Sequence, residues 1–208
     1  MATETRVLDA KTHEIRAVEE DGVRKLVGYG AVFDSLSQDL GGFREKIAPG
    51  AFDRTLAHGK DVLITMNHDV NLLLGRTFAG TGRVHVDDVG LLYEVVTPDT
   101  QAGRDAWTLA ARRDLAGSSF TFSVPKGGDR WERDDTGRVR VLTELALYEL
   151  GPVVTPAYLD TTVAARSLAD IVQTESTEDD EETGTEDGGE ARSDSTLTAT
   201  RRLCRTAR

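Results

Sequence analysis

Short apolar runs, rich in β-branched and aromatic residues, recur along the first 150 residues and are separated by polar turns. Asp-Gly, or acidic residues ending in Gly, separate three pairs of such runs, a pattern typical of β-hairpins. The pairs are residues 13–18 with 23–33, residues 83–86 with 91–96, and residues 131–133 with 138–150. Residues 62–66 and 118–124 form two further runs of this kind. The pattern predicts a chain that is mainly β.

Helical patterns interrupt these runs in three places. We expect helices at residues 49–58, which end before Gly59, and at residues 100–113. A third, at residues 160–172, follows Pro156. The predicted strands follow one another through hairpins instead of alternating with helices, which argues against a doubly wound parallel sheet. We therefore expect an antiparallel β-barrel or sandwich with a few helices.

The composition changes sharply near residue 174 and divides the chain. Residues 174–195 contain ten acidic residues and no large apolar side chain. Such a segment cannot bury enough surface to offset the entropy of ordering it, so we expect disorder. The predicted organisation is a short N-terminal arm at residues 1–12, a folded domain at residues 13–173, and an acidic tail at residues 174–208 with an Arg-rich end.

Charge and cysteine content exclude several classes of protein. The formal net charge of −11 disfavours a nucleic-acid binder, which needs a basic face to neutralise phosphates. The longest apolar runs are too short for a membrane span, and the N-terminus lacks the layout of a secretory signal. The single Cys204 excludes an internal disulfide. We expect a soluble, acidic protein of the cytosol.

Among the four histidines, His68 has the most suggestive position. It follows an apolar run in Asn67-His68-Asp69, where a strand is expected to end in a polar turn. A rigid scaffold would hold the imidazole there while solvent reaches it, which suits a general base. An ordinary turn histidine is the alternative. We interpret His13 and His85 as surface residues, and expect His58 to close a helix beside Gly59, where an imidazolium would interact favourably with the helix dipole.

A strand with hydroxyls on one face supplies a candidate nucleophile. In Gly117-Ser118-Ser119-Phe120-Thr121-Phe122 the side chains of Ser119 and Thr121 should share one face, and the two phenylalanines the other. The aromatic rings would pack into the core, and the hydroxyls would line a surface or groove. Exposed hydroxyl faces are common, so this pattern alone does not identify a nucleophile.

Two acidic residues in a later apolar run complete the candidate chemistry. Glu144 and Glu149 are separated by an odd number of positions, so an unbroken strand would point them to opposite faces and only one could face His68. Serine, imidazole and carboxylate together allow nucleophilic catalysis. A metal site that uses His68 with Asp69 or Glu149 is the competing interpretation, but the ligand spacing is absent.

Several linked motifs resemble the phage prohead protease family. They are Val27 to Phe33 (VGYGAVF), Phe43 to Phe52 (FREKIAPGAF), Asn67-His68-Asp69 with Leu74-Gly75-Arg76, Gly117 to Phe122 (GSSFTF), and Tyr148 to Tyr158 (YELGPVVTPAY). The resemblance covers about residues 13–166 in the family's order. It implies a closed antiparallel β-barrel ringed by a few helices, similar in fold to the herpesvirus assembly proteases.

The resemblance also implies roles for three residues. By motif, Ser119 would be the nucleophile, His68 the general base and Glu149 the acid that orients it, with Glu144 as the other candidate for the third role. Two neighbours depart from the family pattern. Thr121 replaces a usual glycine and adds bulk, which could narrow the groove, and Gly151 replaces a usual serine. No cofactor or metal is implied.

The function implied by the resemblance is serine endopeptidase activity in capsid maturation. The partners would be the scaffold protein or the scaffolding segment of the major capsid protein, inside the assembling procapsid in the host cytoplasm. Self-cleavage, removal of the tail and a homo-oligomer are further expectations, without nucleic acid or membrane. A catalytically inactive assembly protein with the same fold is the alternative, and a binding module unrelated to phage is a third reading.

Overall fold

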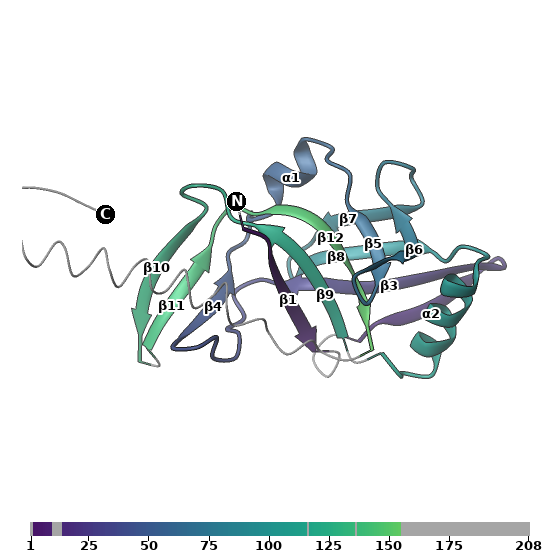
Figure 1. Cartoon of the computed structure of the whole chain (residues 1–208), viewed down its shortest axis with the longest axis horizontal. Helices are drawn as coiled ribbons and strands as arrows, with labels where there is room; N and C mark the ends of the chain where they lie inside the picture. Colours follow the sequence, from purple (N-terminus) through teal and green to yellow (C-terminus); the bar gives the residue numbers. More distant parts are fainter. Residues whose placement is uncertain (1, 10–13, 116, 136, 155–208) are drawn as a thin grey trace, which may run out of the picture. The chain divides into compact units, whose positions relative to one another are not determined.

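The computed structural model describes residues 2–9, 14–115, 117–135 and 137–154 (Figure 1). Within them the chain is mostly β, with twelve strands and two helices. The predicted helix at residues 160–172 and the acidic tail lie outside the described residues. So do the predicted domain boundaries at residues 12/13 and 173/174. Within the described ranges, neither helix has the length and apolar character needed to cross a membrane.

The strand that carries Ser119 lies inside a five-stranded sheet. The order of this sheet is β1 (Glu4–Asp9), β9 (Gly117–Ser123), β12 (Ala146–Val153), β5 (Leu63–Met66) and β6 (Asp69–Arg76). Figure 1 shows β1 beside β9 at one edge. The sequence pattern did not predict β1 or β6. Residues 4–9 of the expected N-terminal arm therefore belong to this sheet.

A second sheet has four strands, in the order β2 (Arg16–Glu20), β3 (Val23–Val32), β8 (Gly90–Val96) and β7 (Gly82–Val86). Its hairpins are the first two that the sequence predicted, and their turns explain why. Asp21 and Gly22 both have positive φ, a conformation that Asp tolerates and Gly adopts freely. At the other turn, the Asp87 side chain accepts bonds from the Val89 and Gly90 amides.

The third sheet has the order β10 (Asp129–Asp134), β11 (Gly137–Leu142) and β4 (Phe43–Ile47). The third predicted hairpin is confirmed as β10–β11, but its long second arm is not one strand. The amides of Thr143 and Glu144 both donate to the Gly128 carbonyl, so the chain leaves β11 before β12 begins. Sequence analysis also missed β4.

The described strands form three sheets, and we find no closed barrel among them. The barrel prediction is therefore not confirmed. The expectation of purely antiparallel pairing is wrong, because β12 is parallel to β5 and β11 is parallel to β4. Each parallel pair joins strands that are distant in sequence, so no hairpin turn dictates their direction.

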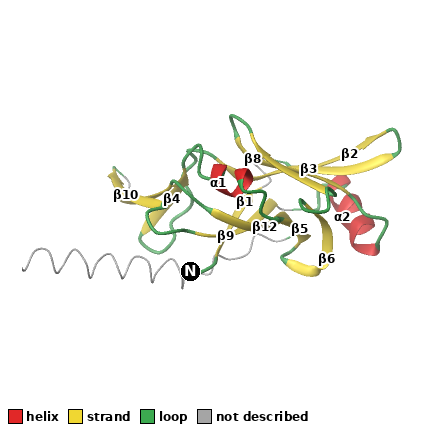
Figure 2. Ribbon diagram, turned by 90° about the horizontal axis from the view of Figure 1, so that it is seen from above, coloured by secondary structure: helices red, strands yellow, loops and turns green. Residues whose placement is uncertain are grey.

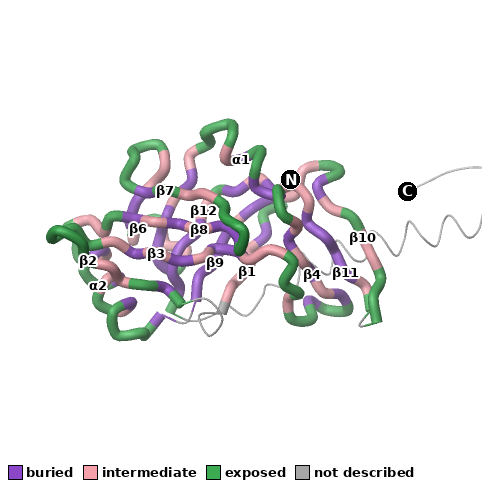
Figure 3. The backbone as a smooth tube through the Cα atoms, turned by 180° about the vertical axis from the view of Figure 1, so that it is seen from behind, coloured by how far each residue is buried: buried purple, intermediate pink, exposed green. Residues whose placement is uncertain are grey.

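The core lies between the five-stranded and four-stranded sheets. Phe120 and Phe122 of β9 are buried and stack with ring centroids 5.1 Å apart. Buried residues lie along β8 and β12, whereas the hairpin tips are exposed (Figure 3). Two separate helices, α1 (Asp53–Ala57) and α2 (Gln101–Ala111), accompany the sheets (Figure 2), and α2 contacts β2, β3 and β6. The first predicted helix is shorter than expected, and the second is confirmed within two residues.

Candidate active site

His68 lies in the tight turn between β5 and β6. Met66 pairs with Asp69, so Asn67 and His68 alone make the turn, with φ values of 56° and 59°. These are left-handed conformations, which type I′ hairpins require and which few residues other than Gly adopt. The Asn67 amide donates to the Pro152 carbonyl (3.0 Å), and its Oδ1 accepts from the Val154 amide (2.9 Å). The turn is thereby fixed to the end of β12.

The imidazole of His68 meets Ser119. The distance from His68 Nε2 to Ser119 Oγ is 2.5 Å. Phe120 and Phe122 face the core, and the Thr121 hydroxyl lies on the same side as that of Ser119, so the predicted alternation along β9 is confirmed. Ser118 faces the core, where its hydroxyl is 3.1 Å from that of Tyr93. Only one of the two neighbouring serines can therefore interact with His68.

Glu149 lies on the other side of the imidazole. Its Oε1 is 3.4 Å from His68 Nδ1 and also accepts a hydrogen bond from the Thr65 hydroxyl. Burial alone would raise the pKa of Glu149, but the contacts with His68 and Thr65 outweigh burial and hold this pKa below its ordinary value. The carboxylate form is thus favoured beside the imidazole.

Glu144 is not part of this arrangement. It precedes β12 and forms an ion pair with Arg54 of α1, with Nη1 and Oε1 2.5 Å apart. The pairing of β9 with β12 also shifts between Leu147 and Glu149, so counting positions along an unbroken strand did not apply. Of the two acidic residues that the sequence left open, Glu149 is the one next to His68.

The other histidines lie elsewhere or outside the described residues. His58 caps the C-terminus of α1, with Nδ1 2.7 Å from the Arg54 carbonyl oxygen. His85 is half-buried on β7, and His13 is not described. Among the described residues, no three His, Cys, Asp or Glu side chains are grouped in a way that could hold a metal ion.

Two threonines were not predicted from the sequence to contact the residues of the site. Thr65 binds Glu149 from β5, and the Thr121 hydroxyl is 3.4 Å from His68 Nδ1. Thr121 therefore places a hydroxyl beside the imidazole, on the face that the alternation predicted, in addition to the bulk inferred from the family pattern. The signal for Thr65 was its place in the run before Asn67, but only the three-dimensional pairing of β5 with β12 reveals the contact.

Gly151, the second departure from the family pattern, has a steric explanation. It pairs with Ser119 across β9 and β12 and has a positive φ of 158°. A Cβ atom at this position would collide with the Thr65 carbonyl oxygen. Glycine thus permits the close approach of β5, which also brings Thr65 to Glu149.

Charged residues near β1 form a separate buried cluster. We define the ionic cluster as Arg6, Arg140, Glu4, Glu45 and Asp129. Arg140 is only 4% exposed and contacts all three acidic residues of the cluster. Arg140 is therefore not a solvated hairpin charge, because its partners Glu4 and Glu45 come from strands distant in sequence.

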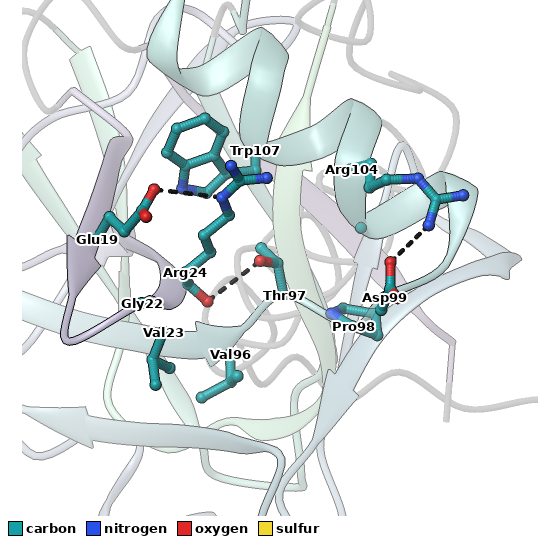
Figure 4. Close-up of a pocket in the computed structure, with 11 residues that line it drawn as sticks. Glu19, Gly22, Val23, Arg24, Val96, Thr97, Pro98, Asp99, Arg104 and Trp107 are labelled. Carbon is teal, nitrogen blue, oxygen red and sulfur yellow. Dashed lines mark hydrogen bonds and ion pairs between the residues drawn. The ribbon is translucent and has the colours of Figure 1, made fainter.

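A surface pocket lies away from these residues. Its lining comes from the β2–β3 turn, the end of β8 and the start of α2, and includes Arg24, whose guanidinium stacks 4.4 Å from the Trp107 ring centroid (Figure 4). Ser119, His68 and Glu149 are not among the lining residues. The three candidate catalytic residues therefore lie outside this pocket, on strands β9 and β12 and the β5–β6 turn of the five-stranded sheet.

Serine, imidazole and carboxylate in this order are the arrangement of serine peptidases. A sequence model of the caudovirus prohead serine proteases matches residues 11–176, and the chain belongs to this family. This finding confirms the resemblance seen in the sequence. Searches among curated proteins and among solved structures found no match.

Proposed function

We propose that this protein is a serine endopeptidase of phage head maturation, with Ser119 as nucleophile, His68 as general base and Glu149 as the acid that orients the base. One observation carries the proposal. His68 Nε2 is 2.5 Å from Ser119 Oγ, while Nδ1 faces Glu149 Oε1 at 3.4 Å. Membership of the prohead serine protease family supports the same assignment.

The mechanism follows from the order of these groups. Ser119 Oγ attacks the carbonyl carbon of the scissile peptide while His68 Nε2 takes its proton. Glu149 stabilises the imidazolium that forms, and His68 then protonates the leaving amine as the C–N bond breaks. Water, activated by the same imidazole, hydrolyses the acyl-enzyme and restores the Ser119 hydroxyl. Each group returns to its starting state.

The proposed substrates are those of the family's setting. A protease of the procapsid would cut the scaffold protein or the scaffolding segment of the major capsid protein, and its own chain. The acidic tail at residues 174–208 has the polar composition of accessible segments that proteases cleave. We assign this activity to the procapsid interior, in the host cytoplasm.

Co-expression with the major capsid protein of the same phage tests the proposal. Intact-mass analysis should show a shortened capsid protein with the wild type and none with Ser119→Ala. Ser118→Ala is the matched control, since its hydroxyl faces Tyr93 instead of His68. If neither the wild type nor Ser118→Ala cuts, and all three proteins enter the shell, the protein is a catalytically inactive assembly protein.

A further inference from the structure

The candidate nucleophile is covered although its partners are accessible. Ser119 has a relative exposure of 0%, whereas the side chains of His68 and Glu149 are 26% and 15% exposed. The cover on one side is β1. Val7 pairs with Ser119, and the Ser119 hydroxyl lies 2.9 Å from the Arg6 carbonyl oxygen, to which it can donate.

The strand β1 has the position and form of a bound peptide. It is extended, lies antiparallel to β9, and within the described residues pairs with no other strand. Extended peptides are commonly recognised by addition to a sheet edge in this way. The family match begins at residue 11, after β1 ends, so the strand is not part of the region that defines the family.

From these observations we infer that the edge of β9 beneath β1 is the binding site for an extended substrate peptide, and that β1 occupies it as an internal substrate mimic. The inference rests on the proposed function for its peptidase role. The peptide enters when β1 moves away, and its scissile carbonyl takes the place of the Arg6 carbonyl beside Ser119.

The surroundings of Arg6 indicate which side chain this site accepts. Arg6 forms two bonds to Glu45, from Nε to Oε1 (2.7 Å) and from Nη2 to Oε2 (3.0 Å), and its guanidinium lies 5.5 Å from the Phe122 ring centroid. A paired, planar contact of this kind suits arginine better than any other residue. The position corresponds to the residue on the N-terminal side of the cleaved bond.

The charges left behind when β1 departs favour the same preference. Arg6 and Glu4 leave together, so their departure does not alter the net charge of the ionic cluster. Arg140 then faces the two acidic residues Glu45 and Asp129, which leaves one negative charge in excess. A substrate with Arg or Lys at the Arg6 position restores the balance, whereas an acidic residue would meet like charge.

The Arg6 carbonyl also explains how β1 restrains the site. A hydroxyl has one proton, and the Ser119 hydroxyl has two acceptors within reach, His68 Nε2 and the Arg6 oxygen. A proton donated to Arg6 is not available to the base. Moving β1 leaves His68 as the acceptor in this pair.

A reversible lock tests whether β1 must move. Leu8 and Ser118 are paired across β1 and β9, and the Ser118 hydroxyl faces Tyr93, on the side of the sheet away from His68. In a Cys204→Ser background, Leu8→Cys with Ser118→Cys should form a disulfide between the strands. We expect oxidation to slow labelling of Ser119 by an arginine-containing peptidyl phosphonate at least tenfold, and reduction to restore it. The same rate in both states would overturn the inference.

A matched lock controls for oxidation itself. Glu19 and Arg24 are paired in the exposed β2–β3 hairpin of the four-stranded sheet. The pair Glu19→Cys with Arg24→Cys therefore joins two strands of a sheet that does not contain Ser119. Its labelling rate should be the same when oxidised and reduced. A parallel fall in this control would assign the effect to oxidation and overturn the inference.

A binding measurement separates this inference from the proposed catalysis. In a Ser119→Ala, Arg6→Glu protein, β1 is loosened by like charge beside Glu45 and no cleavage can occur. A fluorescent peptide with the sequence of residues 3–9 should bind at least ten times more tightly than its Arg→Glu counterpart, by fluorescence polarisation. If the Arg6→Glu protein does not fold, Arg6→Ala replaces it in the same binding measurement. If the arginine peptide binds selectively but the phosphonate does not label Ser119, only the catalytic proposal is refuted. If Ser119 is labelled but the two peptides bind equally, only the inference about β1 is refuted.

Discussion

Two groups of polar side chains flank the Ser119 strand, and they differ in access to water. His68 and Glu149 are part-exposed, whereas Glu45 and Arg140 are almost fully buried in the ionic cluster. A buried ion pair contributes little net stability, but removal of one partner leaves an unpaired charge in the interior. Under the proposed function, the exposed group takes part in the reaction, whereas the buried group holds β4 and β11 in register, together with β1 while it lies on β9.

The largest expected effect is loss of activity without loss of fold. His68→Ala should lower the cleavage rate by about 10⁵-fold, because Ser119 loses its base. The melting temperature should stay within a few degrees of the wild type. His58→Ala is the control, since the His58 imidazole bonds to the Arg54 carbonyl oxygen at the end of α1, outside the candidate site. Peptide hydrolysis measures the cleavage rate and calorimetry the melting temperature. An equal loss of cleavage rate in both variants would contradict the assignment.

The next largest effect distinguishes the two acidic candidates. Glu149→Gln keeps the size of the side chain but removes the charge beside His68 Nδ1, and should lower the cleavage rate by about 10⁴-fold. Glu144→Gln breaks only the exposed ion pair with Arg54 and should leave the rate unchanged. Steady-state kinetics on both variants measure this difference. A larger loss for Glu144→Gln would reverse the assignment.

The ionic cluster should respond in the opposite way. Arg140→Met leaves Glu4, Glu45 and Asp129 without a shared cation and should lower the free energy of unfolding by about 3–5 kcal/mol. The exposed Arg130→Met should change it by less than about 0.5 kcal/mol. Urea unfolding measures both. An Arg140→Met protein as stable as the wild type would show that the cluster does not hold the strands.

The smallest expected effect is a pH dependence at Glu149. Because the folded-state pKa of Glu149 lies below its unfolded value, ionisation of Glu149 stabilises the fold above the unfolded pKa of about 4.3. That stability is lost as pH falls through the folded pKa. Lowering the pH from 6 to 3 should therefore reduce the free energy of unfolding less in Glu149→Gln than in Glu144→Gln. Identical reductions in the two variants would contradict the lowered pKa of Glu149.

The sequence predicted those parts of the fold that local turns dictate. Asp21 and Gly22 encode a hairpin by themselves, and so do the residues around Asp87. The strand β1 has no such turn, and its mixture of charged, polar and apolar residues becomes meaningful only beside β9. The ionic cluster was missed for the same reason, since Glu4 and Arg140 are 136 positions apart.

The candidate site was predictable only as a set of motifs. The sequence suggested Ser119, His68 and Glu149, and the structure brings these three together. Thr65 and the Arg6 carbonyl could not be foreseen, because the first depends on parallel pairing of β5 with β12 and the second is a backbone atom. Neither contact leaves a pattern in residue types.

The two-residue turn at Asn67 and His68 has a consequence for the timing of the reaction. Its left-handed backbone is bound at Asn67 to the end of β12, so the imidazole acquires its direction while the protein folds. A base on a loose loop would have to give up conformational freedom each time a peptide arrived, and the activation barrier would include that entropy. In the proposed mechanism, the imidazole is already oriented before the peptide binds, and the binding energy of the peptide remains available for aligning its own carbonyl.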